Sequence, residues 1–185
     1  MKQATQVIND TRCWIETVVI GYNFCPFAGR EFTRNSIHYH VCRQAEIEDI
    51  LFESIEECRR LDTTDSIETT LLILPEQFSE FDEFLDLLEI AERLMIDQDY
   101  EGIYQLASFH PLYCFADSTA QDPANYTNRS PCPMLHLIRE DSLEKALASY
   151  SDPEGIPLRN MELTRRLGKT KMVDLLAASY RADIE

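Results

Sequence analysis

The sequence predicts a single α/β (or α+β) domain, in which a four-stranded mixed sheet packs with about five helices. The chain has 185 residues, a length that suits one domain over residues 1–185. Apolar residues make up 44% of it, enough to build a folded core. Segments with helical spacing of apolar residues alternate with short apolar or alternating segments, as in proteins whose strands are joined by helices. We expect roughly the first eight residues and the last few to be flexible.

The first helix is predicted over residues 9–22, where Trp14, Val18 and Tyr22 recur at helical spacing. The first strand is predicted over residues 36–43, because apolar and polar side chains alternate there and one face is therefore buried. The other elements are predicted as helix 46–61, strand 69–76, helix 80–95, strand 103–111, strand 134–140, helix 142–150 and helix 161–180, the last with an interruption at Gly168.

These elements give the order α-β-α-β-α-β-β-α-α. Strand–helix–strand units need crossover connections, so the first three strands should be largely parallel. The fourth strand follows the third through a long loop and could pair antiparallel with it. The order of the strands within the sheet is left open.

The charge of the chain is strongly uneven. The formal net charge is −16, and the segment from Glu46 to Glu101 holds 19 Asp and Glu residues against three Arg. Such a surface repels phosphate backbones and excludes nucleic acid as a partner. The simplest explanation is that the acidic faces of two helices are solvated.

The first residues carry no apolar run typical of a secretion signal, and no apolar stretch reaches the roughly 20 residues that a membrane helix needs. We therefore expect a cytoplasmic protein with no membrane partner, in which the six cysteines are reduced. The sequence contains no GxGxxG, GxxxxGK[ST] or GxSxG motif, so dinucleotide, P-loop and hydrolase readings have no support.

Several segments together resemble a known family. The segments "WIETVVIGYNFCPFA", "SFHPLYCFAD", "ANYTNRSPCPMLHLIRE" and "IPLRNMELTRRLG" resemble the bacterial family called domain of unknown function 1415. The resemblance covers about Thr11 to about Gly168. It implies no reaction, because the family has none assigned. The shared positions are Cys25, His110, Pro111, Asn125, Tyr126, Asn128 and Arg129, and this chain departs from the pattern at Leu112 and Cys114.

Two candidate catalytic residues arise from these segments. His110 ends the third strand, and ligands of parallel sheets gather beyond the carboxyl ends of strands. It could be the general acid or base, or it could hold the loop through a ring N–H bond to a carbonyl. Cys25 could be a nucleophile or a ligand, although a cysteine among aromatic residues is more often a buried apolar residue.

The segment "DPANYTNRSP" offers candidate ligand-binding residues. Arg129 could hold a carboxylate or phosphate, and Asn125 and Asn128 could orient a polar ligand. The alternative is that these residues bond their own loop. Arg139 is a further candidate, because a charge on the core side of the fourth strand needs a partner or a ligand.

His38, His40 and Cys42 share one face of the first strand, a spacing that can build a zinc or iron site. No complete metal motif occurs, so no metal ligands are assigned, and no cofactor is identified.

The leading hypothesis is a small-molecule enzyme or binding domain for a polar, anionic ligand, with its site at the loop after the third strand. Whether the protein is an enzyme stays open. One alternative is a non-catalytic interaction module that uses the acidic helices or the basic segment 159–171. A second alternative is a metal-binding protein.

Overall fold

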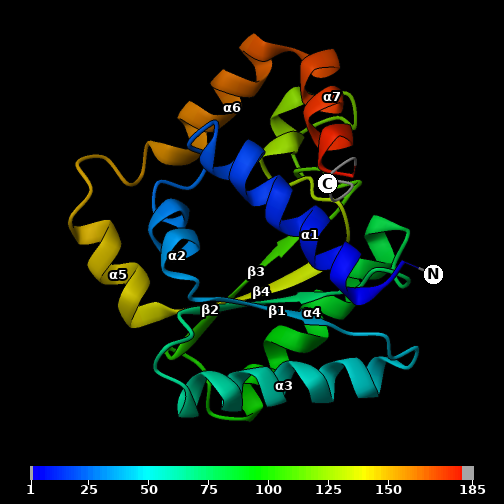
Figure 1. The fold of residues 1–185 in the computed structure, drawn as a ribbon, viewed down its shortest axis with the longest axis vertical. Helices are drawn as coiled ribbons and strands as arrows, with labels where there is room; N and C mark the ends of the chain where they lie inside the picture. The colour runs from blue at the N-terminus through cyan, green and yellow to red at the C-terminus, as the bar shows by residue number, and fades with distance from the viewer. Residues whose placement is uncertain (1, 181–185) are drawn as a thin grey trace.

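The computed structural model describes residues 2–180 and confirms an α/β domain built on a four-stranded mixed sheet (Figure 1). The strands are β1 (Ile37–Val41), β2 (Thr69–Ile73), β3 (Tyr104–Phe109) and β4 (Met134–Arg139). The helices are α1 (Ala4–Trp14), the π-helix η1 (Ile15–Ile20), α2 (Ala28–Arg34), α3 (Ile47–Thr63), α4 (Phe81–Asp97), the 3₁₀ helix η2 (Pro123–Thr127), α5 (Glu140–Ala148), α6 (Ile156–Leu167) and α7 (Lys169–Ser179).

The order of the strands in the sheet is β1-β2-β4-β3. β1 and β2 are parallel, and β4 lies between β2 and β3, antiparallel to both. The first three strands therefore point the same way, and the antiparallel pairing of the fourth with the third is confirmed. The position of β4 between β2 and β3 was not predicted, because the sequence left the order of the strands open.

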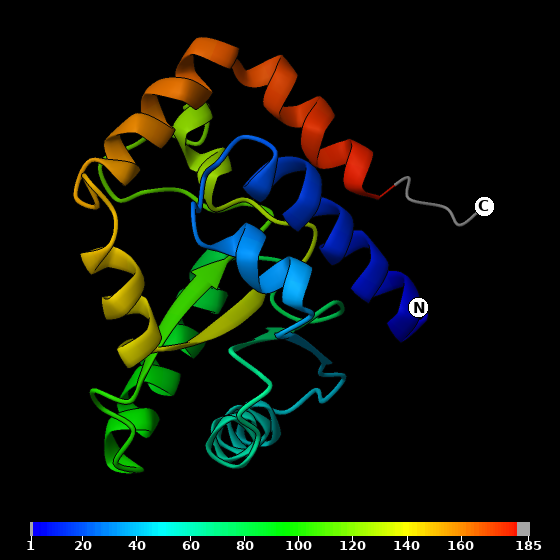
Figure 2. The same cartoon turned by 60° about the vertical axis from the view of Figure 1, so that its left-hand side comes forward.

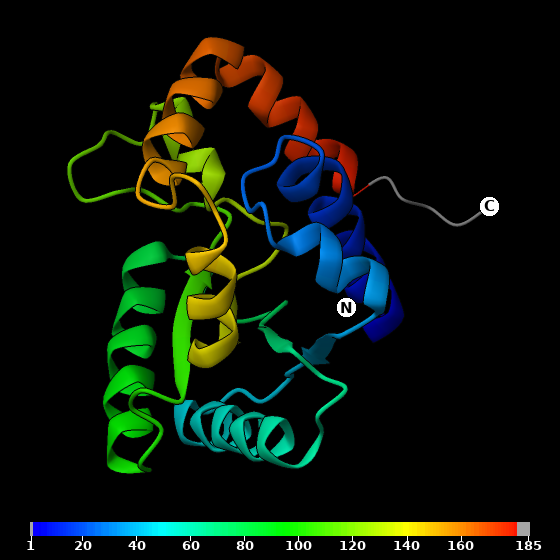
Figure 3. The same ribbon diagram turned by 90° about the vertical axis from the view of Figure 1, so that its left-hand side faces the viewer.

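Both faces of the sheet are covered. All five residues of β2 are buried. Successive side chains of a strand point to opposite faces, so β2 contributes core residues to both sides of the sheet. On one face Leu71 and Ile73 pack with α1, η1 and α7. On the other face Leu72 joins the core formed with α3 and α4. The figures show α3 and α4 on the opposite side of the sheet from α1 and α2 (Figures 1 and 3).

The first helical segment differs from the prediction in two respects. It begins at Ala4, five residues earlier than predicted, and buries Val7. After Trp14 it continues as a π-helix, in which the N–H of Gly21 bonds the carbonyl of Glu16. π-Helical turns are rare and are frequent at functional sites. The short helix α2 was not predicted, because its seven residues contain no fully buried side chain.

The predicted interruption at Gly168 is confirmed as a sharp bend between α6 and α7 (Figures 2 and 3). Gly168 has φ 81° and ψ 158°, a region open almost only to glycine. Gly168→Ala is therefore expected to lower the free energy of unfolding by about 1–3 kcal/mol, measured by urea denaturation. Gly29→Ala is the matched control: it lies inside α2, and its new Cβ would meet only the Ile20 methyl at 3.7 Å, so it should be neutral or slightly stabilising. Equal effects of the two changes would contradict this account.

Candidate functional site

The loop after β3 contains most of the predicted site residues, and the structure shows what each one contacts. The N–H of His110 bonds the carbonyl of Asn128, so the segment around Asn128 folds back beside His110. The His110 side chain is fully buried. Its Nδ1 accepts from the N–H of Leu112 at 3.0 Å, so its Nε2 carries the proton and donates to the carbonyl of Phe78 at 2.8 Å. Burial lowers the pKa of His110, which keeps this neutral form at neutral pH. Both ring nitrogens are thus occupied within the protein, which favours the structural alternative for His110.

Asn125 and Arg129 also bond their own loop. Asn125 is fully buried; its side chain accepts from the N–H of Phe115 and donates to the carbonyl of Thr119. Arg129 donates to the carbonyls of Tyr113 and Ala120, both at 3.1 Å. Its guanidinium also stacks on the Tyr126 ring, 4.5 Å from the ring centre. The polar residues of this loop therefore satisfy buried backbone groups of the loop itself.

The basic segment near the C-terminus meets the same loop. Arg165 of α6 forms an ion pair with Asp122 at 2.7 Å. This contact lowers the pKa of Asp122 to about 2, chiefly through the hydrogen bond from Arg165. Asp122 also accepts from the N–H of Ala124 at the start of η2. Arg165 and Asp122 thus hold α6 against η2.

Arg139 lies away from the other candidates. In the sheet Arg139 lies opposite Tyr104, the first residue of β3, whereas His110 follows Phe109, the last residue of β3. The two candidates therefore lie at opposite ends of β3. Its guanidinium donates to the carbonyls of Leu61 and Ile67 on the α3 side of the sheet. Backbone carbonyls therefore satisfy the charged side chain of Arg139, and no ligand is needed to do so.

Two cavities lie near β3, and Cys25 lines both of them. The second cavity, of about 760 Å³, also contains Asn128 and the segment 115–118. Burial raises the pKa of the Cys25 thiol, so the thiolate is disfavoured at neutral pH. Of the six predicted residues, the structure thus brings only Cys25 and Asn128 together at a cavity.

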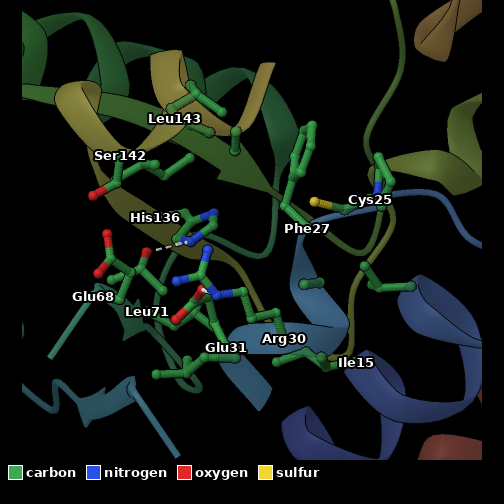
Figure 4. Close-up of a pocket in the computed structure, with 18 of the residues that line it drawn as sticks. Ile15, Cys25, Phe27, Arg30, Glu31, Glu68, Leu71, His136, Ser142 and Leu143 are labelled. Carbon is green, nitrogen blue, oxygen red and sulfur yellow. Dashed lines mark hydrogen bonds and ion pairs between the residues drawn. The ribbon is translucent and has the colours of Figure 1, made fainter. Parts of the chain in front are cut away.

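The other cavity has a volume of about 580 Å³, and we call it the His136 cavity. Its lining comes from the four strands of the sheet, from α1 and η1, and from α2 and α5. Its lining is mostly apolar and contains Trp14, Ile15, Val19, Phe27, Ile37, Leu71, Ala107, Phe109, Ile138, Leu143 and Ala146. Figure 4 shows His136, Glu68, Arg30 and Glu31 near one another, with Cys25 and Phe27 farther along the cavity. An apolar cavity of this size with few polar groups is typical of small-molecule sites.

The geometry around His136 fixes its tautomer. Thr69 Oγ1 lies 2.6 Å from both the carbonyl of Leu137 and Nε2 of His136. The single hydroxyl proton goes to the carbonyl, which can only accept, so Nε2 of His136 must carry a proton and donate to Thr69. Nδ1 of His136 then holds a lone pair and has no partner among residues 2–180.

The charge state of His136 follows from its surroundings. Burial lowers its pKa to about 4, so the ring is neutral at neutral pH. Nδ1 has no hydrogen-bond partner, but it is not fully buried, so it is open to the cavity that His136 lines. The side chain therefore presents a hydrogen-bond acceptor to the cavity.

Two further lining residues have unsatisfied polar atoms. Oε1 of Glu68 and Nε1 of Trp14 are fully buried and have no hydrogen-bond partner among residues 2–180. Buried polar atoms are rarely left unpaired in folded proteins, and each such atom calls for an explanation. Because neither atom has accessible surface, neither faces the open volume of the His136 cavity in this structure.

Sequence reasoning did not include His136, Thr69 or Glu68 among the site residues. In the sheet, Leu71 is directly opposite His136, and Thr69 is its diagonal neighbour. This pairing depends on β4 lying beside β2, which the sequence does not state. The only available signal was the parity of β4, which places His136 and Arg139 on opposite faces.

Within the described residues, none of the helices has the length and apolar character needed to cross a bilayer. No curated protein and no solved structure matches the chain significantly. The family model described as "Protein of unknown function (DUF1415)" matches residues 6–174, which is most of the chain and includes both cavities and the loop after β3. The chain therefore belongs to the DUF1415 family.

Proposed function

We propose that the protein is a small-molecule-binding domain whose ligand occupies the His136 cavity. The observation that carries this proposal is the neutral His136 ring, which is held in one tautomer by Thr69 and offers an unpartnered Nδ1 to a mostly apolar cavity. Pre-organised polar groups of this kind orient ligands in apolar pockets. The proposal moves the site from the loop after β3 to the neighbouring cavity, which shares Cys25 and Phe109 with the second cavity.

The lining indicates the chemistry of the ligand. His136 Nδ1 is an acceptor, so the ligand should carry a hydroxyl or amino group that donates. Arg30 and Lys145 also line the cavity and could meet an acidic group. The apolar lining suits an aliphatic or aromatic body. We infer a small amphipathic acid that carries a hydroxyl or amino group.

If the protein is an enzyme, Nδ1 of His136 would be the atom that accepts a proton from the ligand. An anionic ligand bound beside the ring would raise the pKa of His136 toward neutrality and make it a better base. The six unpaired thiols are typical of a reducing compartment, and we extend the proposal to a cytoplasmic location.

The experiment compares thermal shifts produced by arylacetates that do or do not carry an α-hydroxyl or α-amino group. The substituted acids are expected to raise the melting temperature more than the unsubstituted acids, because only they donate to Nδ1 of His136. In His136→Phe, which keeps a ring but removes both nitrogens, this difference should disappear.

A blocked cavity provides the control. Ala146 lines the cavity, whereas Ala148 is exposed on the same helix. Ala146→Trp should abolish the shifts, and Ala148→Trp should leave them unchanged. Shifts that survive Ala146→Trp would show that the compounds bind elsewhere, and the proposal would then fail.

A further inference from the structure

We propose that His38, His40 and Glu57 form a binding site for a divalent transition-metal ion, of which Zn²⁺ fits best. The site lies on the face of the sheet opposite the His136 cavity and is independent of the proposed function. β1 is an edge strand, and His38 and His40 are two residues apart on it, so their side chains share a face. Glu57 lies on α3, which covers that face.

The distances between ligand atoms suit a metal ion. Nδ1 of His40 lies 3.2 Å from one oxygen of Glu57, and Nε2 of His38 lies 3.5 Å from the other. One ligand atom from each of the three residues can be chosen so that all lie within 4.8 Å of one another. A tetrahedral ion with bonds of about 2.0–2.1 Å holds its ligand atoms about 3.3 Å apart. Each histidine thus lies at about this distance from one oxygen of the same carboxylate, so Glu57 faces both imidazoles at a spacing that suits a shared ion.

The second nitrogen of His40 supports the assignment. Nε2 of His40 lies 2.7 Å from Oε2 of Glu53, and Oε1 of Glu53 accepts from Gln44 at 3.0 Å. Metal-binding histidines commonly donate their other ring N–H to a carboxylate, which fixes the tautomer and the ring orientation. With that proton on Nε2, Nδ1 directs its lone pair toward Glu57. Two acceptors that face each other need a proton or a metal ion between them, and a bound metal ion would displace the proton from Nδ1.

The charges and exposure also favour a cation. The Glu57 side chain is 1% exposed, and Nε of Arg60 contacts both of its oxygens, at 3.1 and 3.2 Å. Glu53 and Glu57 together outweigh the single charge of Arg60, so the cluster is negative when the imidazoles are neutral. The histidine side chains are 31% and 28% exposed, which leaves the site open to solvent and a coordination position free for water.

The ligand types select the ion. Two imidazoles and one carboxylate suit Zn²⁺ and related first-row ions, whereas Mg²⁺ and Ca²⁺ prefer oxygen ligands. Cys42 follows on the same face of β1 and was grouped with these histidines in the sequence. It is fully buried and does not belong to the group of atoms within 4.8 Å of one another, so it is not included as a ligand.

The test is calorimetric titration of untagged, chelator-treated full-length protein with Zn²⁺, and with Mg²⁺ for comparison. We expect one equivalent of Zn²⁺ to bind and the melting temperature to rise, because the ion joins β1 to α3. Mg²⁺ should do neither. Binding should be lost in the double variant with His38→Gln and His40→Gln. Glu53→Gln should weaken it roughly 10- to 100-fold, because Glu53 acts only through His40.

His136→Gln is the matched control, since His136 lies on the other face of the sheet and should leave Zn²⁺ binding unchanged. Circular dichroism of each variant separates lost binding from lost folding. The proposal is overturned if the wild type binds no stoichiometric Zn²⁺, if the folded double variant binds as tightly as the wild type, or if His136→Gln weakens binding equally.

Discussion

Replacing His110 by alanine is expected to lower the free energy of unfolding by about 3 to 4 kcal/mol. The ring is fully buried and packs 5.2 Å from the rings of both Phe81 and Phe84. Its removal leaves a cavity and also strands the carbonyl of Phe78 and the N–H of Leu112, which it bonds in the wild type. The measurement is urea denaturation followed by circular dichroism.

His38→Ala serves as the comparison, because His38 is about a third exposed and should cost less than about 1 kcal/mol. The ligand-binding assay gives a second readout. If His110→Ala kept the stability of the wild type but no longer bound the acids that the wild type binds, His110 would act on a ligand and its structural role would be refuted.

Acidification is expected to destabilise the protein through His136 by about 3 kcal/mol between pH 6.5 and pH 4. Burial lowers the pKa of His136 from 6.5 to about 4 in the folded state. Below pH 6.5 the unfolded chain therefore binds a proton that the folded chain does not, so stability falls as the pH falls. The loss levels off below pH 4, where the folded form is also protonated. The measurement is the free energy of unfolding at half-unit steps of pH.

The variant His136→Gln isolates this contribution, because glutamine can still donate to Thr69 but does not titrate. Its stability should fall less steeply than that of the wild type over this range. The variant His40→Gln should lose stability relative to the wild type at low pH rather than at high pH. Glu57 and Glu53 raise the pKa of His40, so His40 stabilises the fold below pH 6.5, and that stability is lost as the pH rises through the raised pKa. Parallel curves for wild type and His136→Gln would show that His136 does not titrate abnormally.

The fold was predictable where apolar spacing is regular. Helix α4 places Phe84, Leu87, Ala91 and Met95 on one buried stripe, and β2 is an uninterrupted buried run. The π-helix η1 was not visible, because it continues the apolar pattern of α1 with only a small change of spacing. The position of β4 was not predictable either, because it depends on long-range pairing.

The candidate site was less predictable than the fold. The loop after β3 was correctly singled out as rich in polar residues, but the sequence could not show which carbonyls lie near Arg129 or Asn125. The structure shows that these side chains bond the loop's own backbone. His136 was placed on the fourth strand but was not chosen as a site residue, because its environment comes from β2, α2 and α5, which are distant in the sequence and meet only in the folded protein.

The central place of β4 constrains how the chain folds during synthesis. β2 and β3 do not pair with each other, and β4 joins the β1–β2 pair to β3. Until residue 139 has left the ribosome, β2 can pair only with β1, and its other edge stays open. An open apolar edge is a template for pairing with other chains. Nascent chains that stall before β4 should therefore depend on chaperones, whereas chains that extend past it can close the sheet.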